Sequence, residues 1–201
     1  TAHASEQERD DVKAARQAWF DRQDDLEIER LFFIDECGTN TKMARTRGRS
    51  KRGMRCRADI PHGHWKTTTL VAALTTSGIA APMILDGAMD GDMFIAYVTH
   101  VLLKELRSGD VVVMDNLPAH KVAGVRAIIE GIGAKLMYLP PYSPDFNPIE
   151  KAFSQIKAFL KKTAARTKEK LDAAIADAID VVSAQNAINY FAACGYESDT
   201  V

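Results

Sequence analysis

Three short segments of the sequence carry acidic residues at positions where carboxylates could act together. They are residues 32–36 (FFIDE), 111–116 (VVVMDN) and 140–150 (PPYSPDFNPIE). Asp35 and Asp115 each follow a short apolar run, which is typical of a buried strand whose carboxyl end carries functional groups. Glu150 follows four prolines within nine residues and falls where a helix can first begin.

Carboxylates at these three positions would form a metal site if they converge. Converging negative charges repel one another unless cations lie between them. Oxygen ligands favour hard ions, so Mg²⁺ or Mn²⁺ is the predicted occupant. Each acid also has a purely structural explanation, because Glu150 could complete a cap with Asn147 and the two aspartates could be exposed charges at strand ends. Their joint occurrence at matching positions favours the metal site.

The hydrophobic pattern predicts the elements that must hold these acids. Short apolar runs predict strands at 31–34, 67–75, 79–85, 111–114 and 135–139. Apolar residues at helical spacing predict helices at 5–20, 92–106, 119–130, 148–162 and 168–182. The second and third strands form a hairpin, and Asn147 caps the fourth helix. This order predicts an α/β fold with a partly parallel, mixed sheet flanked by helices.

The composition is that of an ordinary soluble globular protein, with 46% hydrophobic and 26% charged residues among 201. No run of about 18 apolar residues could span a membrane, and the first residues carry no apolar signal core. Cys37, Cys56 and Cys194 are odd in number and unrelated in spacing, which argues against a disulfide framework. We therefore expect a cytoplasmic protein, and Thr1 in place of a methionine predicts that an upstream portion is missing.

The net charge of −1 conceals two strongly basic segments. Positions 42–57 hold eight Lys or Arg residues and no acid, and positions 151–170 hold seven against the single acid Glu169. Phosphate backbones attract such blocks through Coulomb attraction and counterion release. A solvated charged face is the alternative interpretation of each block. We predict that the first block is a loop or hairpin that contacts nucleic acid.

The three acidic segments resemble those of the DDE endonuclease superfamily, and specifically those of mariner-like transposases of bacterial insertion sequences. Residues 140–150 are similar to the signature of that family around its last acid almost letter for letter. Asp115 and Glu150 have 34 residues between them, which is the separation found in that group. The similarity covers about residues 31–159 and continues toward Tyr196.

The resemblance implies a ribonuclease-H-like catalytic domain at residues 31–196, preceded by a linker or appended N-terminal helix at 1–30. It implies that two Mg²⁺ or Mn²⁺ ions serve DNA strand cleavage and transfer at transposon ends, with these catalytic ligands: Asp35, Asp115 and Glu150. Asn116 and His120, beside the second acid, would have accessory roles. The implied partner is double-stranded DNA, both transposon ends and target, with no membrane. A homodimer is a candidate assembly, and a bacterial, nucleoid-associated location is expected.

The helix expected to carry Glu150 also has a basic face, which we expect to form part of a path for the DNA backbone. Ser154, Lys157 and Lys161 recur on the same face as the acid. The opposite stripe faces the core and consists of Ile149, Phe153, Ile156 and Leu160. Together with the first basic block, this face gives the basic residues expected to bind DNA: Arg45, Arg47, Arg49, Arg52, Lys157 and Lys161.

Three alternatives stay open at this point. Another nuclease of the same fold class, such as a ribonuclease or a junction resolvase, would differ in its preference for DNA or RNA hybrids. A non-enzymatic, domesticated DNA-binding protein would not need the three acids, all of which are intact. A zinc site at Cys56, His62 and His64 would lack a fourth ligand and the paired spacing of structural zinc sites.

Overall fold

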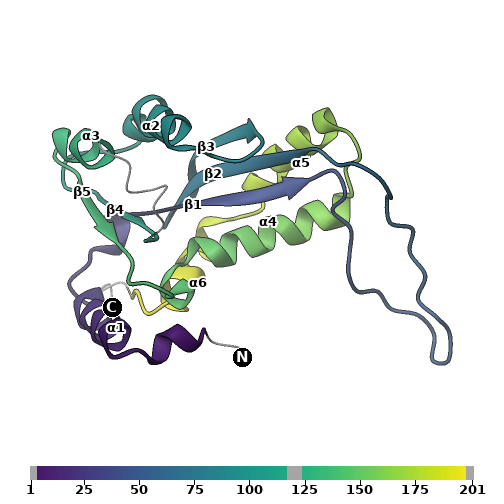
Figure 1. Ribbon diagram of the computed structural model, residues 1–201, viewed down its shortest axis with the longest axis horizontal. Helices are drawn as coiled ribbons and strands as arrows, with labels where there is room; N and C mark the ends of the chain where they lie inside the picture. The colour runs from purple at the N-terminus through teal and green to yellow at the C-terminus, as the bar shows by residue number, and fades with distance from the viewer. Residues whose placement is uncertain (1–3, 117–123, 198–201) are drawn as a thin grey trace.

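One mixed sheet forms the centre of the computed structural model, which describes residues 4–116 and 124–197 (Figure 1). Its strands are β1 (Leu31–Asn40), β2 (Thr67–Thr75), β3 (Gly78–Asp86), β4 (Val111–Met114) and β5 (Lys135–Tyr138). They lie in the order β3-β2-β1-β4-β5. The first three strands pair antiparallel, whereas β4 is parallel to both β1 and β5. The predicted hairpin and the partly parallel sheet are confirmed.

Strand β1 is longer than its apolar run predicted. The prediction ended the strand at Ile34, but the strand continues through Asp35 to Asn40 because this part pairs with β2. The parallel ladder with β4 ends where Ile34 pairs with Met114. Asp35 therefore lies just beyond the β1–β4 ladder but in the middle of β1. For Asp35 the expected position at a strand end was therefore wrong, whereas Asp115 directly follows the end of β4 as expected. Asp35 is also buried.

Six α-helices are described, and four short 3-10 helices accompany them. The α-helices are α1 (Asp10–Gln23), α2 (Gly91–His100), α3 (Val125–Gly131), α4 (Ile149–Thr163), α5 (Lys168–Asp180) and α6 (Ala184–Ala192). The 3-10 helices are η1 (Ser5–Glu8), η2 (Ile28–Arg30), η3 (Leu102–Lys104) and η5 (Pro144–Phe146). The sequence did not predict α6, which starts with a capping box between Ser183 and Asn186. Of the helix predicted at 119–130, residues 119–123 lie outside the described residues.

The helices cover both faces of the sheet, with α2 and α3 on one face and α4, α5 and α6 on the other (Figure 1). Side chains alternate between these faces along each strand. Phe33 of β1 and Val113 of β4 belong to the core under α4, whereas the residues that follow them belong to the core under α2 and α3. Asp35 lies two residues after Phe33, and Asp115 lies two residues after Val113. Both aspartates therefore point to the α4 side. The alternation thus places both aspartates on the face where α4 begins.

Helix α4 is docked by the apolar stripe that the sequence predicted. Ile149, Phe153, Ile156 and Leu160 are all buried against the sheet. The helix runs along the sheet toward the end of β1 (Figure 1). Just after the helix, Arg166 donates hydrogen bonds to the backbone carbonyls of residues 41 (3.2 Å) and 43 (2.8 Å), which directly follow β1. Helix α4 therefore connects the region of the acids with the base of the loop after β1.

Residues 41–66, between β1 and β2, form an arm that projects away from the body of the protein (Figure 1). The arm contains neither helix nor strand, and residues 45–60 are all exposed. At its base the ammonium group of Lys42 lies 4.5 Å from the centre of the Trp65 ring. Of the two forms predicted for the first basic block, a loop or a hairpin, the structure has the loop.

Helix α1 packs against the C-terminal part of the chain. The indole N–H of Trp19 donates to the hydroxyl of Tyr196 (3.0 Å), and the amide of Gln23 donates to the carbonyl of Cys194 (2.9 Å). Val12 is also a buried residue of α1. No helix of the described residues has the length and apolarity needed to cross a membrane.

The docking of α4 yields a stability prediction. Ile156→Ala removes a fully buried side chain between α4 and the sheet. The free energy of unfolding, measured by urea denaturation, should fall by about 2–5 kcal/mol, because both apolar burial and close packing are reduced. Lys162→Ala, at an exposed position of the same helix, should change it by less than about 0.5 kcal/mol. Equal effects of the two substitutions would contradict the docking described here.

Candidate active site

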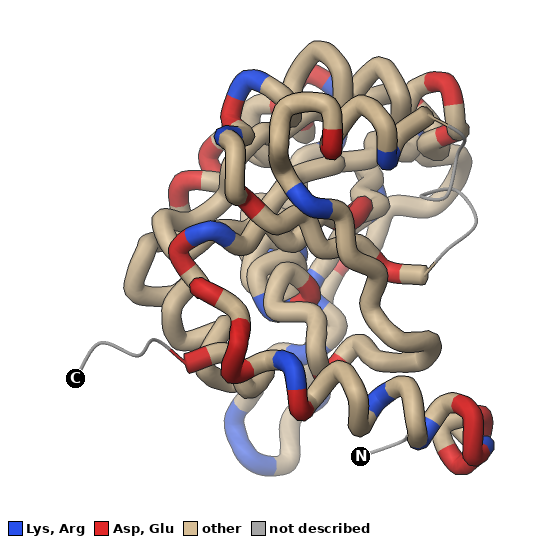
Figure 2. The backbone as a smooth tube through the Cα atoms, turned by 90° about the vertical axis from the view of Figure 1, so that its left-hand side faces the viewer, with Lys and Arg blue, Asp and Glu red and all other residues tan. Residues whose placement is uncertain are grey.

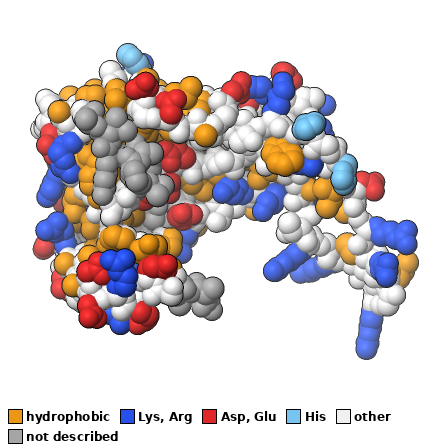
Figure 3. Space-filling model, viewed as in Figure 1, with side chains coloured by type: hydrophobic (Ala, Val, Ile, Leu, Met, Phe, Trp, Pro, Cys, Tyr) orange, Lys and Arg blue, Asp and Glu red, His pale blue; other side chains and the backbone are white. Residues whose placement is uncertain are grey.

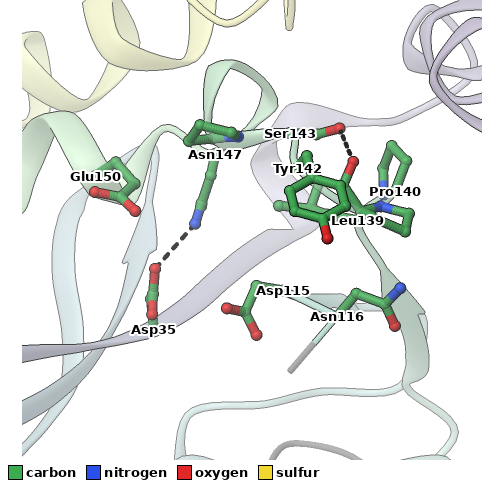
Figure 4. A pocket seen from close by; sticks show the side chains of 11 residues that line it. Asp35, Asp115, Asn116, Leu139, Pro140, Tyr142, Ser143, Asn147 and Glu150 are labelled. Carbon is green, nitrogen blue, oxygen red and sulfur yellow. Dashed lines mark hydrogen bonds between the residues drawn. The ribbon is translucent and has the colours of Figure 1, made fainter. Parts of the chain in front are cut away.

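A pocket of about 370 Å³ lies where β4 ends and α4 begins (Figure 4). Its lining consists of Asp35, Asp115, Asn116, Leu139, Pro140, Pro141, Tyr142, Ser143, Pro144, Asn147 and Glu150. The three acids predicted from the sequence and Asn116 are therefore brought together. The Pro-rich segment supplies the remaining lining. No Lys or Arg occurs among the described residues that line the pocket, so its charge is negative.

The carboxylate of Asp35 is buried and held at both oxygens. Its Oδ1 accepts a hydrogen bond from the backbone N–H of Glu36 (2.8 Å), and its Oδ2 accepts one from the side-chain amide of Asn147 (3.1 Å). The pKa of Asp35 is raised to about 7, mainly by burial and additionally by the negative charges of Asp115 and Glu150. The hydrogen bond from the Glu36 N–H opposes this increase. A positive charge in the pocket would favour the ionised form of Asp35.

Asn147 has a different role from the one the sequence predicted. The prediction made it the cap of a helix that starts at Pro148, but α4 starts at Ile149 with Pro148 at the N-cap position and no side-chain cap. The amide of Asn147 turns instead to Asp35 (Figure 4). In this orientation the side-chain N–H donates to the carboxylate of Asp35, and the Oδ1, which a cap would use as acceptor, has no hydrogen-bond partner among the described residues. The Asn in the Pro-rich signature was the only sequence signal for this contact.

The other two acids approach Asp35 from different elements. Asp115 directly follows β4, the parallel neighbour of β1, and its side chain lies beside that of Asp35 (Figure 4). Glu150 reaches the same region from the first turn of α4 and is exposed to solvent. Asn116 lines the pocket next to Asp115. His120, the second expected accessory residue, lies outside the described residues.

The pocket suits a hard divalent cation, although the protein does not form a complete cage. Within residues 4–116 and 124–197, no three His, Cys, Asp or Glu side chains are already arranged to hold a metal ion, the three acids included. Mg²⁺ does not require such a cage, since it usually combines one or two carboxylates with waters and substrate phosphates. The donors here are carboxylate and amide oxygens. In the described part of the chain the buried Oδ1 of Asn147 also lacks a hydrogen-bond partner.

The basic residues predicted to bind DNA are located on two surfaces. All four of the arm, Arg45, Arg47, Arg49 and Arg52, are exposed, and Lys and Arg side chains stand out along the arm in Figure 3. The two lysines of α4, Lys157 and Lys161, are half-buried. Acidic residues, in contrast, are spread over the body and along α1 (Figure 2). The small net charge therefore results from a basic arm and a mixed body.

The described cysteine and histidine side chains form no group of three that could hold a metal ion. Cys56, His62 and His64 are exposed on the arm and form no metal-binding group of three among the described residues. Cys37 is buried under α4, and its thiol has a pKa raised to about 11. Burial is the main cause, and the positive charge of Lys157 lowers this pKa in part. Cys37 is therefore protonated near neutral pH and packs as a core residue.

Comparison with known proteins identifies the family and the fold. The family model described as DDE superfamily endonuclease matches residues 30–172. No curated protein sequence is significantly similar to the chain. Among solved structures, the Mos1 transposase paired-end complex with left transposon end has a TM-score of 0.75 at 16% identity. The match covers 96% of this chain and 61% of that chain, so the present chain spans about three-fifths of its length.

Two further Mos1 structures are similar. The Mos1 mariner paired-end complex with Mn has a TM-score of 0.70 at 15% identity, over 96% of this chain and 61% of that one. The structure of the Mos1 transposase catalytic domain and raltegravir with Mg has a TM-score of 0.67 at 14% identity, over 96% and 92%. At such identities the likeness shows the fold. The ribonuclease-H-like mixed sheet predicted from the sequence is confirmed.

The buried carboxylate of Asp35 gives a prediction on pH. Its pKa is about 7 in the folded protein and 3.8 without perturbation, so the folded state binds the proton more tightly and ionisation destabilises it. In metal-free buffer, Asp35→Asn should raise the free energy of unfolding by roughly 1–4 kcal/mol above pH 7. This gain should disappear as the pH falls toward 4. Urea denaturation between pH 4 and 8 measures it, with exposed Asp177→Asn as the control. A gain that does not vary with pH would exclude this explanation.

Proposed function

Because the chain belongs to the DDE endonuclease superfamily, we propose that it is the catalytic domain of a transposase, which cuts DNA at transposon ends and joins the cut ends to target DNA. The observation that carries the proposal is the meeting of Asp35, Asp115 and Glu150 in one negatively charged pocket. They come from a central strand, the end of its parallel neighbour and the first turn of a helix. The similarity to a Mos1 transposase complexed with a transposon end supports double-stranded DNA as the partner.

The three acids would hold two divalent ions, Mg²⁺ or Mn²⁺. Mos1 structures with Mg and with Mn support a divalent metal. When bound in such a site, these ions lower the pKa of a water or of a DNA 3′-hydroxyl and stabilise the leaving 3′-oxygen. Hydrolysis and strand joining both consist of attack by an oxygen on a phosphodiester, so one set of ligands can serve both.

The chain contributes fixed ligand positions. Asp35 cannot turn freely, because the Glu36 N–H and the Asn147 amide each hold one of its oxygens. Asp115 is placed beside it by the parallel β1–β4 ladder, and Glu150 by the buried stripe of α4. The carboxylate oxygens of Asp35, held in this way, would require little reorganisation during the reaction. Asn116, adjacent to Asp115 in the pocket, would orient water or the DNA backbone.

The basic surfaces would bind the DNA backbone on both sides of this chemistry. Lys157 and Lys161 lie on the α4 face that starts at Glu150 and leads to the base of the arm. Arg45, Arg47, Arg49 and Arg52 would extend the contact along the exposed arm. Positive charge outside the pocket and negative charge inside it are suited to holding a polyanion over bound cations.

Removal of any one acid should abolish activity. Asp35→Asn, Asp115→Asn and Glu150→Gln keep side-chain size but remove a negative ligand. Each should reduce metal-dependent strand cleavage by more than about 100-fold, because even an outer-shell partner of a metal ligand can contribute that much. Gel assays of cleavage and joining of duplex DNA in Mg²⁺ or Mn²⁺ measure the effect.

Two controls make this test decisive. Exposed Glu105→Gln should leave the cleavage rate unchanged, and thermal melting should show that all variants fold. If Glu150 only stabilised the helix start, Gln would serve nearly as well and activity would survive. Cleavage without divalent metal by the unmodified chain would refute the mechanism. Cleavage of RNA–DNA hybrids in preference to duplex DNA would assign the chain to another nuclease class.

The arm should govern the salt dependence of DNA binding. Simultaneous replacement of Arg45, Arg47, Arg49 and Arg52 by Ala should reduce the slope of log K against log[salt] by about 0.9 for each phosphate that the arm no longer neutralises. Fluorescence anisotropy with a labelled duplex at several salt concentrations measures this slope. The control replaces four exposed basic residues outside the arm by Ala and so has the same charge change. These residues lie in α1, η3, the η3–β4 connection and β5, in this order: Lys13, Lys104, Arg107 and Lys135. Equal slopes for the two variants would show that total charge, and not the arm, determines binding.

A further inference from the structure

The Pro-rich segment that supplies much of the pocket lining is held from its outer side by α1. The guanidinium of Arg16 donates to the Ser143 hydroxyl (2.8 Å) and, through two nitrogens, to both carboxylate oxygens of Asp145 (2.9 and 2.7 Å). It also donates to the carbonyl of Tyr142 (3.4 Å) and lies 4.8 Å from the centre of the Phe146 ring. One side chain thus contacts four of the five residues from 142 to 146.

A second connection from α1 reaches the same segment. Trp19 donates to the hydroxyl of Tyr196 (3.0 Å), which in turn donates to the carbonyl of Phe146 (2.8 Å). All three side chains are buried. Phe146 directly precedes Asn147, whose amide holds Asp35. The contacts from α1 therefore reach the residue directly before Asn147, whose side chain lies in the pocket.

The segment needs this support because its own backbone is not relaxed. Tyr142 has φ of +55°, in the left-handed region that non-glycine residues adopt only with strain. Prolines at 140, 141, 144 and 148 remove backbone donors that could otherwise fix the segment to neighbouring strands. Arg16 and Gln7 both donate to the Tyr142 carbonyl and so hold this peptide orientation.

We propose that Arg16 is a positioning residue of the active site, which fixes residues 142–147 so that Asn147 keeps Asp35 in its ligand orientation. The contacts of Arg16 are with residues 142–146 and not with Asp35 or Glu150, so it would act through this segment. This role rests on the proposed function for its effect on catalysis. The positioning itself is a property of the metal-free chain and can be measured there.

The arrangement explains why an arginine is needed at position 16. Its planar fork binds the Asp145 carboxylate at two points while another hydrogen bond reaches Ser143, and its face covers Phe146. A lysine would keep the charge but could not form the bidentate pair. The side chain of Arg16 is 22% exposed and that of Asp145 is 52% exposed, so solvent screens the pair in part and the additional contacts of Arg16 with Ser143 and Phe146 contribute to holding the segment.

The test compares Arg16→Ala, Arg16→Lys and a control, Arg22→Ala, at an exposed position of the same helix. Hydrogen–deuterium exchange of the metal-free proteins is followed in peptides covering residues 142–150. Arg16→Ala should accelerate exchange there about tenfold while the strands β1, β2 and β4 keep their protection. Arg16→Lys should lie between Ala and the unmodified chain, and Arg22→Ala should have no effect.

Cleavage assays then connect positioning to chemistry. At saturating DNA, Arg16→Ala should raise the Mg²⁺ concentration for half-maximal cleavage by about 10- to 100-fold, as expected when an outer partner of a metal ligand is removed. Asp145→Asn should have a similar effect, and combining the two substitutions should add little more, because both break the same ion pair. DNA affinity should stay constant.

Several outcomes would overturn the inference. They are unchanged exchange in Arg16→Ala, faster exchange throughout the protein without a local effect, or an unchanged Mg²⁺ dependence in a variant that cleaves DNA. If Arg16→Ala does not fold, Arg16→Lys and Asp145→Asn decide by the same measurements. If the unmodified chain does not cleave DNA, the proposed function fails while the exchange data still decide the positioning role. If the chain cleaves but exchange is unaffected, only the positioning role fails.

Discussion

A carboxylate inside a sheet loses most of its hydration, and Asp35 is in this situation in the middle of β1, where only 9% of the residue is exposed. Two hydrogen bonds compensate for part of this desolvation, one from the next backbone N–H and one from Asn147. The neighbouring acids add repulsion to the desolvation. A site of this kind is stable with protons or cations present and is strained without them, which is the electrostatic condition expected of a metal-binding pocket.

The rest of the fold holds this carboxylate and its neighbours together. The parallel β1–β4 ladder sets the two aspartates side by side, and the alternation of side chains points both toward α4. Helix α4 uses its apolar stripe to dock on the sheet and its other face to present Glu150 and two lysines. Because one rigid helix carries both the acid and the two lysines, the spacing between Glu150 and this basic face is fixed.

Negative and positive charges are concentrated in different parts of the structure. The pocket is lined by acids, whereas the arm is an exposed, basic loop anchored at its base by Arg166. A basic pocket would compete with cations for the carboxylates, and an acidic arm would repel phosphates. Averaged over the chain these regions give a net charge of −1, so total charge does not reveal the basic arm.

Local patterns in the sequence were sufficient for much of the fold and for selecting three acids that line one pocket. The apolar runs of β2 and β4, the stripe of α4 and the Pro-rich signature before Glu150 depend on neighbours within a few residues, which the sequence displays directly. The tertiary structure alone decided that β1 continues past Asp35, since that extension depends on pairing with β2. It also decided the contacts of Asn147 with Asp35 and of Arg16 with Asp145, whose partners lie 112 and 129 residues apart. Burial and hydrogen-bond partners over such separations are set by how the chain packs, and no local periodicity encodes them.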